Sequence, residues 1–152
     1  MAVSTEDIKK LREETGAGVM DAKKALDEVG GDFSKAKDYL MKNSLSKALK
    51  KADRTTLEGV IASYVHAGGK MASLVHLSCE TDFVAKNADF IELANSLAKQ
   101  VCAIKYETVE EVLADTYIKD PSLKIADLIN QAIAKIGEKI ELSRFVRYAV
   151  KE

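Results

Sequence analysis

The spacing of the apolar residues changes near residue 56, and this change limits the possible folds more than any other feature of the sequence. Up to that point apolar side chains recur every three or four residues, as they do on one face of a helix. Beyond it, segments 57–66 and 71–79 are rich in strand-forming residues. Gly68 and Gly69 lie between these segments and favour a tight turn. The sequence therefore predicts helices followed by an antiparallel hairpin.

The first 42 residues have room for three short helices. Ser4 and Asp7 have the spacing of a capping box at a helix start. Two glycine-containing segments, 15–18 and 30–31, interrupt the apolar pattern, and Asp32 is a candidate N-cap for the third helix. So short a unit has a small core, and we expect it to be a compact binding module.

Segment 43–55 has the composition of a connector. Between positions 42 and 54 the chain has five basic residues and one acid, with few large apolar residues, so we expect a helical or partly flexible linker with a solvated face. No aromatic residue lies among the basic ones to stack on bases. The whole chain has 23 basic and 24 acidic side chains and a net charge of -1. A nucleic-acid partner is therefore not expected.

The rest of the chain reads as a second domain. After the hairpin, apolar residues repeat at helical spacing from Phe90 to Ile104. A short acidic helix is expected near residues 109–113, and a longer helix is expected to begin at Pro121 and to end at Gly137. The final segment reads as a third strand, and its alternation places these residues on one face: Ile140, Leu142, Arg144, Val146, Tyr148 and Val150.

The order strand, strand, helices, strand places the helices on one face of a small antiparallel sheet. We therefore predict an α+β protein in three parts. The first is a three-helix domain at 1–42, the second a basic helical linker at 43–55, and the third an α+β core at 56–152 with a three-stranded antiparallel sheet.

The residues offer little for catalysis, cofactor binding or metal binding. His66 and His76 lie in adjacent predicted strands with Cys79 and Asp82 nearby, but their spacing matches no common zinc signature. The chain has no GxxxxGK[ST] or GxGxxG motif for binding a nucleotide itself. We expect a protein that is not an enzyme and that has no cofactor and no metal.

The cysteines and the first residues indicate a cellular compartment. Cys79 and Cys102 lie in segments expected to be buried, and reduced structural thiols are the favoured interpretation. Residues 1–7 have no feature of a secretion or transit signal, and no apolar run approaches the roughly 18 residues needed to cross a membrane. We expect a cytoplasmic protein with no membrane contact.

The segment from Ser78 to Asn87 reads SCETDFVAKN and follows the second predicted strand. Thr81 can cap the next helix and place Asp82 and Phe83 in its first turn. The residues alone leave two interpretations of Phe83. It is either a core residue, which the pattern alone favours for a phenyl ring, or a surface probe beside an acidic cap.

Three separated motifs resemble the bacterial elongation factor Ts family: LREETGAGVMDAKKALDEVGGD at 11–32, CETDFVAKN at 79–87 and IGEKIELSRF at 136–145. They occur in the family's order, and the likeness spans essentially the whole chain. It implies a ubiquitin-associated-type three-helix domain, a linker and a core. It also implies a function, because members of this family bind the GTPase elongation factor Tu and accelerate the release of its GDP.

The resemblance implies contact residues as well. The TDFV corner would consist of Thr81, Asp82, Phe83 and Val84. Phe83 would wedge between helices of the GTPase near its magnesium, and Asp82 would hold or disturb the same region. The first module would touch the nucleotide-binding domain of the GTPase through Leu11, Val19 and Met20.

The chain departs from the family's usual residues in small ways, with Val19 in place of Met, Ala22 in place of Cys and Ser78 in place of Asn. Longer members carry a second core-like half, whereas short members work as homodimers. The resemblance therefore implies a homodimer that forms a two-plus-two complex with the GTPase, and segment 140–150 is a candidate joining surface. The alternative is a non-exchange adaptor, in which the three-helix module captures a peptide and the core only dimerises.

Overall fold

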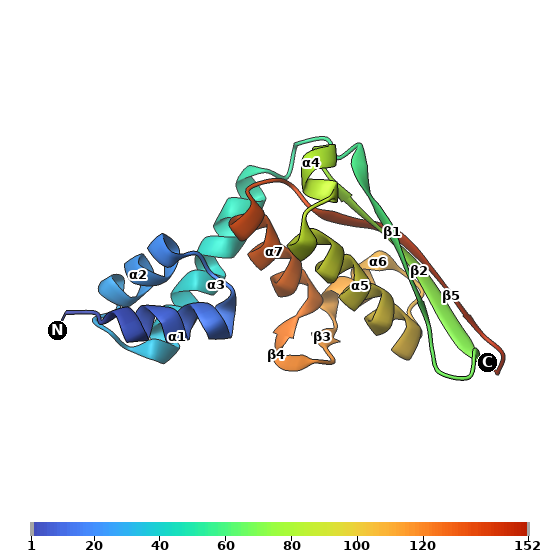
Figure 1. Cartoon of the computed structure of the whole chain (residues 1–152), viewed down its shortest axis with the longest axis horizontal. Helices are drawn as coiled ribbons and strands as arrows, with labels where there is room; N and C mark the ends of the chain where they lie inside the picture. The colour runs from blue at the N-terminus through green and yellow to red at the C-terminus, as the bar shows by residue number, and fades with distance from the viewer. Residues whose placement is uncertain (1, 152) are drawn as a thin grey trace.

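The computed structural model describes residues 2–151 and has an α+β architecture. A group of three helices lies at one end of an elongated molecule, and the larger sheet lies at the other end (Figure 1). The elements are, in order, α1 Thr5–Thr15, α2 Val19–Glu28, α3 Phe33–Lys50, β1 Glu58–Val65, β2 Met71–Cys79, α4 Asp82–Ala85, α5 Ala88–Ala103, α6 Val109–Ala114, β3 Thr116–Tyr117, β4 Asp120–Lys124, α7 Ile125–Ile136 and β5 Glu141–Ala149.

The three N-terminal helices begin where their sequence signals predict. Ser4 and Asp7 form the expected capping box at α1, and the Asp32 carboxylate accepts a hydrogen bond from the Lys35 backbone N–H at the start of α3. These helices enclose a small core of their own: Leu11, Ala22, Ala25, Leu26, Ala36 and Leu40. Because this core is small, each of its apolar contacts carries a large share of the module's stability.

Helix α3 is longer than a three-helix module alone requires. It continues without interruption to Lys50, so most of the basic segment is helical. The second half of α3 packs against α7, and Ala48 contacts the larger core. An ion pair of 3.0 Å between Lys47 and Asp21 joins the same half to α2. One helix therefore belongs to both ends of the molecule.

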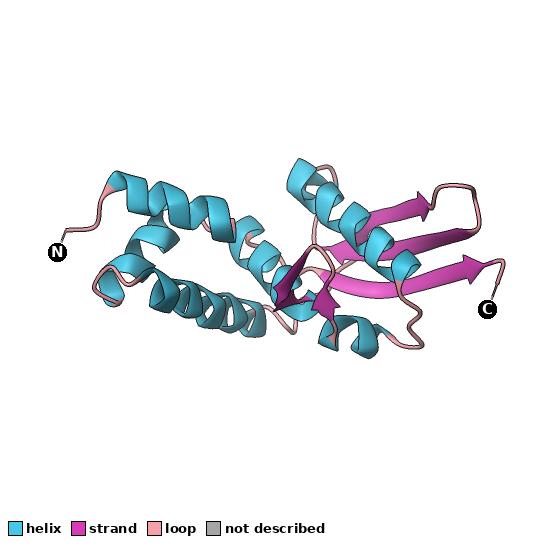
Figure 2. Ribbon diagram, turned by 90° about the horizontal axis from the view of Figure 1, so that it is seen from below, coloured by secondary structure: helices cyan, strands magenta, loops and turns pink. Residues whose placement is uncertain are grey.

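The larger sheet is antiparallel, with the strand order β1-β2-β5. The predicted hairpin is confirmed, with Gly68 and Gly69 in its turn. Helix α5 runs across the strands (Figure 2) and packs on β1 and β2. The inward residues of the sheet share one core with α5 and α7, centred on Val75, Leu77, Phe90, Leu97, Val101, Ile125 and Leu142.

A β-bulge in β5 corrects the predicted faces of the last strand. His76 pairs with Arg144 and Leu77 with Leu142, so Ser143 is left without a partner in the ladder. One extra residue reverses the side-chain alternation beyond it. Leu142 is buried as predicted, but Val146 and Tyr148 lie on the helix-free face, at 38% and 75% exposed. Phe145 instead packs against the core.

The segment that begins at Pro121 is a short strand, not the start of a helix. Residues 120–124 form β4, which pairs with β3, and helix α7 begins only at Ile125. The Asp120 carboxylate accepts hydrogen bonds from the Ser122 backbone N–H and hydroxyl, at 3.2 and 2.6 Å, which keeps this segment extended. Proline is tolerated here because β4 is an edge strand.

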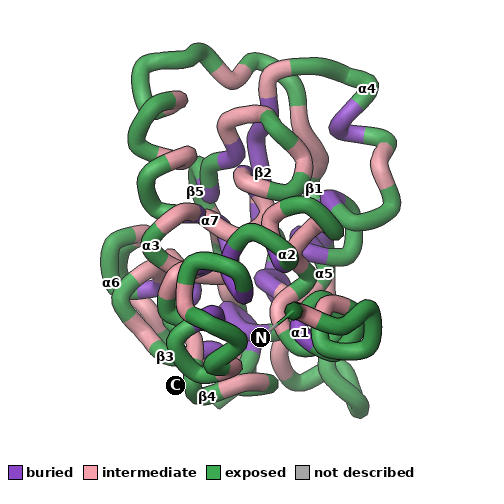
Figure 3. The backbone as a smooth tube through the Cα atoms, turned by 90° about the vertical axis from the view of Figure 1, so that its left-hand side faces the viewer, coloured by how far each residue is buried: buried purple, intermediate pink, exposed green. Residues whose placement is uncertain are grey.

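Most of the buried apolar residues belong to the two cores described above. In Figure 3 the buried residues gather inside the helices and beneath the sheet, and α4 lies at the periphery. Within residues 2–151 no helix combines the length and the apolar character that crossing a bilayer requires.

Gly59 in β1 lies so close to β2 that a side chain has no room. Its φ is 154°, and an added Cβ would lie 2.2 Å from the Leu77 carbonyl oxygen. We expect Gly59→Ala to lower the free energy of unfolding by about 2–4 kcal/mol, because β1 must move away from β2. Gly18→Ala is the matched control, since nothing lies within 4 Å of its added Cβ. Urea unfolding followed by circular dichroism measures both, and equal losses would contradict this packing.

Candidate functional site

The TDFV corner joins the end of β2 to α5 and contains a single turn of helix, α4. Thr81 is its N-cap, and the Thr81 hydroxyl oxygen accepts a hydrogen bond of 3.3 Å from the Val84 backbone N–H. Thr81, Asp82 and Phe83 are exposed, whereas Val84 is 6% exposed and packs in the core. The turn therefore presents its first residues to solvent and anchors itself through the next one.

Phe83 is a surface residue. Its side chain is 82% exposed, which contradicts the interpretation of Phe83 as a core residue. Neighbouring Asp82 forms an ion pair of 3.5 Å with Lys86, but both side chains are at least 70% exposed. Such an exposed pair contributes little to stability. The corner therefore displays a phenyl ring next to a carboxylate that is free to change partner.

A second helix begins immediately after the corner, where the sequence pattern suggested a continuous helix from Thr81. The Asn87 side chain accepts hydrogen bonds from the backbone N–H groups of Asp89 and Phe90, at 2.9 and 3.3 Å, and so caps α5. Phe90 is fully buried. Two phenylalanines seven positions apart therefore have opposite roles, because the helix restarts between them.

The loop after α7 makes hydrogen bonds to the TDFV corner. Glu138 follows Gly137, the left-handed C-cap of α7. One oxygen of the Glu138 carboxylate, Oε1, accepts from the backbone N–H groups of Glu80 and Thr81, both at 3.1 Å. The other oxygen, Oε2, accepts from the Thr81 hydroxyl at 2.8 Å.

Glu80 makes the reciprocal contact. Its Oε2 accepts from the Lys139 backbone N–H at 2.7 Å and from Arg54 Nη1 at 3.3 Å. Sequence reasoning did not find Glu80 or Glu138 as functional residues. Both lie in quoted motifs, but they are 58 positions apart, and nothing in either motif indicates that they pair.

Cys79 lies directly beneath the corner and is fully buried. Its Sγ donates a hydrogen bond of 3.2 Å to the Thr81 carbonyl oxygen. Burial, with the nearby Glu138 carboxylate as the next cause, raises the pKa of this thiol to about 11. Cys79 and Cys102 are both buried free cysteines, as the sequence indicated. Cys79 is therefore a neutral packing residue at ordinary pH.

The three residues expected to act in the first module differ in exposure. Met20 and Val19 begin α2 and are 73% and 48% exposed. Leu11 is fully buried in the small core, so its side chain has no surface to offer to a partner. Leu11 supports the module from inside, and only the two residues of α2 are placed to make contacts.

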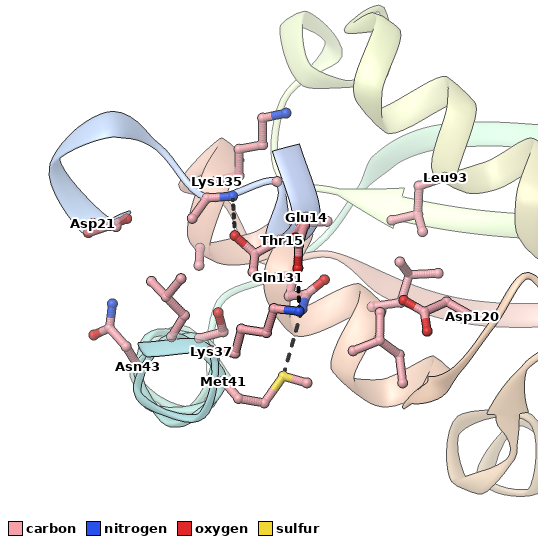
Figure 4. Close-up of a pocket in the computed structure, with 18 of the residues that line it drawn as sticks. Glu14, Thr15, Asp21, Lys37, Met41, Asn43, Leu93, Asp120, Gln131 and Lys135 are labelled. Atoms are coloured by element: carbon pink, nitrogen blue, oxygen red, sulfur yellow. Dashed lines mark hydrogen bonds and ion pairs between the residues drawn. The ribbon is translucent and has the colours of Figure 1, made fainter. Parts of the chain in front are cut away.

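A groove of about 550 Å³ separates the three-helix module from the core (Figure 4). Lys37 pairs with Glu14 at 2.5 Å, and Lys135 pairs with Asp89 at 3.2 Å, so these lysines of the groove are already in ion pairs.

In residues 2–151 no group of three or more His, Cys, Asp or Glu side chains is arranged to hold a metal ion.

The two histidines are not close together. His76 pairs with Ile61 in the middle of the β1-β2 ladder, whereas His66 lies at the hairpin turn, where its backbone N–H donates to the Met71 carbonyl oxygen. Each ring has a hydroxyl neighbour two residues away along the chain, Tyr64 for His66 and Ser78 for His76. They do not form the shared site that adjacent strands could have allowed.

Known proteins resemble the chain over its full length. The family described as "Elongation factor TS" matches residues 80–152. An elongation factor Ts from Thermotoga petrophila is 43% identical over 195 aligned positions, which cover 100% of this chain and 98% of that protein. One from Fervidobacterium nodosum is 42% identical over 197 positions, with 100% of both chains covered. One from Clostridium kluyveri is 44% identical over 150 positions, which cover 99% of this chain but 49% of that protein.

These likenesses place the chain among the translation elongation factors. Within that class, it belongs to the elongation factor Ts family. The alignments with the Thermotoga and Fervidobacterium relatives are longer than the 152 residues of this chain, so those proteins have stretches with no counterpart here.

The Cys79 thiol makes stability fall at high pH. Its folded pKa, about 11, lies above its ordinary value of 9.0, so the folded state holds this proton more tightly. The contribution is complete below pH 9.0 and is lost as the pH rises towards about 11. We expect the free energy of unfolding to fall by up to about 3 kcal/mol from this cause, at roughly 1.4 kcal/mol for each pKa unit.

Urea unfolding of the unaltered chain and of Cys79→Ala, compared across this pH range, isolates the contribution of the thiol. Burial and a hydrogen bond to Asp115 raise the pKa of Tyr106 to about 12. This tyrosine is present in both proteins, so it affects them equally. The difference in stability between the two proteins should shrink as the pH rises. A difference that stays constant would show that the thiol ionises as easily in the folded chain as in the unfolded one.

Proposed function

We propose that the chain is a guanine nucleotide exchange factor that binds elongation factor Tu and accelerates the release of its GDP in the translation elongation cycle. Membership of the elongation factor Ts family supports this proposal. The structural observation that carries it is the Phe83 ring, which is 82% exposed on a turn with an N-cap and buried residues beneath it. We also propose a cytoplasmic location for this chain.

The Phe83 ring is not buried by folding, so it can still be buried against a partner. Burying a phenyl side chain contributes roughly 1.5–3 kcal/mol, and such an anchor in a partner pocket often acts as a hot spot. In the proposed complex Phe83 enters between helices of the GTPase near its magnesium. Asp82, whose ion pair with Lys86 is exposed, approaches the same region. Together they stabilise a conformation of the GTPase that holds magnesium and GDP poorly.

Exchange then follows from linkage and requires no covalent step. Two ligands that weaken each other do so to the same degree, so a factor that loosens GDP is itself loosened by GDP. Rebinding of nucleotide releases the factor. The chain in this proposal is not an enzyme in the covalent sense, and it acts with no metal or cofactor of its own.

The three-helix module is proposed to be a ubiquitin-associated-like domain that contacts the GTPase from another side, with α3 as its helical linker to the core. Met20 and Val19 supply its exposed apolar surface at the start of α2. Leu11 holds α1 against α2 from within. The contact of α3 with α7 would keep this surface at a constant distance from the corner.

The helix-free face of the larger sheet is proposed as a homodimer interface. It presents five large apolar side chains that are 38–75% exposed: Ile61, Val65, Leu74, Val146 and Tyr148. We call this surface the outer sheet face. Two such faces can pack as a β-sandwich, in which inner-face side chains interdigitate. A dimer formed this way leaves both TDFV corners free for a two-plus-two complex with the GTPase.

Removal of the Phe83 ring tests the exchange proposal. We expect Phe83→Ala to slow stimulated GDP release from elongation factor Tu by about tenfold or more, because losing about 1.4 kcal/mol from the transient complex is a factor of ten. The measurement is stopped-flow release of a fluorescent GDP analogue. Ile118→Ala, which shortens another exposed apolar side chain on the β3-β4 turn, is the control.

The fold of the Phe83 variant should be unchanged, since the ring makes little contact within the chain. Full exchange activity in Phe83→Ala would remove the corner from the mechanism. An unaltered chain that fails to accelerate GDP release at all would overturn the proposed function and favour the adaptor.

A charge in the middle of the outer sheet face tests the dimer. Leu74 lies on the central strand, 45% exposed, and pairs with Val146 on one side. We expect the unaltered chain to sediment at twice 16.6 kDa and Leu74→Asp to sediment at 16.6 kDa, because an unpaired carboxylate is costly to bury. Ile118→Asp adds the same charge elsewhere and should remain a dimer. Monomeric behaviour of the unaltered chain at micromolar concentration would refute this interface.

A further inference from the structure

We propose that Glu138 is the positioning residue of the TDFV corner: through Thr81 it fixes the direction in which α4 presents Asp82 and Phe83. This inference rests on the proposed function and assigns a role to a residue outside the proposed set of GTPase contacts. Glu138 lies on the loop after α7, 55 positions beyond Phe83 in the sequence, and meets the corner through hydrogen bonds.

The Glu138 carboxylate satisfies three donors at once. Two are the backbone N–H groups of Glu80 and Thr81, which lie just beyond the last pair of the β1-β2 ladder. The third is the Thr81 hydroxyl, at 2.8 Å. Hydrogen bonds to an ionised acceptor are stronger than those between neutral groups. One side chain thus fixes two consecutive peptide groups and the side chain of the cap residue.

The direction of the Thr81 hydroxyl is the important consequence. Because its hydrogen points to Glu138, a lone pair of the same oxygen remains for the Val84 backbone N–H, which it accepts at 3.3 Å. This second bond is the N-cap of α4. A helix of four residues has no stability of its own, so its orientation depends on such contacts. Glu138 therefore acts on Phe83 through Thr81.

The reciprocal contact closes the arrangement. Glu80 Oε2 accepts from the Lys139 backbone N–H and from Arg54, and Lys139 Nζ donates to the Ala52 carbonyl oxygen at 2.8 Å. The end of the linker, the corner and the α7-β5 loop are thereby joined at one place. The positive charge of Arg54, which pairs with Glu80 at 3.3 Å, also offsets part of the repulsion between Glu80 and Glu138.

If Glu138 positions the corner, its loss should change the mobility of the corner and leave the fold intact. If Glu138 only stabilised the chain, its loss should weaken the fold. The core beneath the corner contains Val84, Ala85 and Phe90, which are buried among apolar side chains of the larger core. We therefore expect Glu138→Ala to leave the fold in place and to free the corner. The exchange rate then falls because the ring no longer occupies one direction.

The motion of the corner can be measured without the GTPase. The chain has no tryptophan, so Phe83→Trp provides a single fluorescent probe at the position of the ring. We expect Glu138→Ala to increase the amplitude of nanosecond anisotropy decay of this probe by about twofold or more, since a released loop moves on that timescale. Glu110→Gln, an exposed glutamate on α6, is the matched control and should change nothing.

Exchange kinetics supply the second readout. With the full chain, we expect Glu138→Ala to lower the maximal rate of stimulated GDP release by about tenfold and to change the half-saturating concentration by less than about threefold, because the remaining contact surfaces are intact. Glu138→Gln should be milder, since its amide oxygen can still accept from the two backbone N–H groups. This graded rescue is not expected from a residue that only fills space.

The double variant separates positioning from independent stabilisation. If Glu138 acts only through the ring, Glu138→Ala adds less than about twofold to the loss already caused by Phe83→Ala. Losses that simply multiply, or an unchanged anisotropy decay in Glu138→Ala, would overturn the inference. A chain that accelerates no GDP release would overturn the proposed function instead, and the anisotropy experiment would still decide whether Glu138 holds the corner.

Discussion

The backbone N–H groups at the end of β2 need hydrogen-bond partners, and the geometry of the corner depends on how the chain supplies them. A strand that stops and a helix that begins both leave donors unpaired. Here the Glu138 carboxylate takes the donors of the strand end, and the Thr81 hydroxyl takes one from the helix start. Because both needs are met within the chain, Phe83, two residues after Thr81, can remain exposed without loosening the turn that carries it.

The exposed Phe83 ring is one of several apolar groups on the surface of the chain. Folding leaves apolar side chains in solvent at the start of α2, at the corner, on the outer sheet face, and also on α3 at Leu45 and Leu49. Two separate cores already stabilise the chain, so these groups are not needed for folding. Exposed apolar surface of this kind is typical of binding sites. Helix α3, which packs in both halves of the molecule, sets the distance between the first two groups and so allows one partner to meet both.

The sequence predicted the parts of the fold that depend on local chemistry. Capping by Ser4, Asp32 and Thr81 and the hairpin at Gly68 follow from short-range signals, and the three-stranded antiparallel sheet follows from the order of the predicted elements. It could not predict features set by contacts between distant segments. The bulge at Ser143 arises from pairing with β2 and reverses the faces of Val146 and Tyr148. The pattern alone also favoured burial of Phe83, because it does not show that Asn87 restarts the helix so that Phe90 takes the core position.

The account requires the corner to be stiff before any partner arrives, and backbone ¹⁵N relaxation of the free chain measures this most directly. If Glu138 and the cap hold the turn, the amide order parameters from Thr81 to Val84 should match those of β2, at about 0.85. Values below about 0.6 across these residues would show a flexible loop. A loop of that kind would have to become ordered on binding, and the preformed corner described above would not exist.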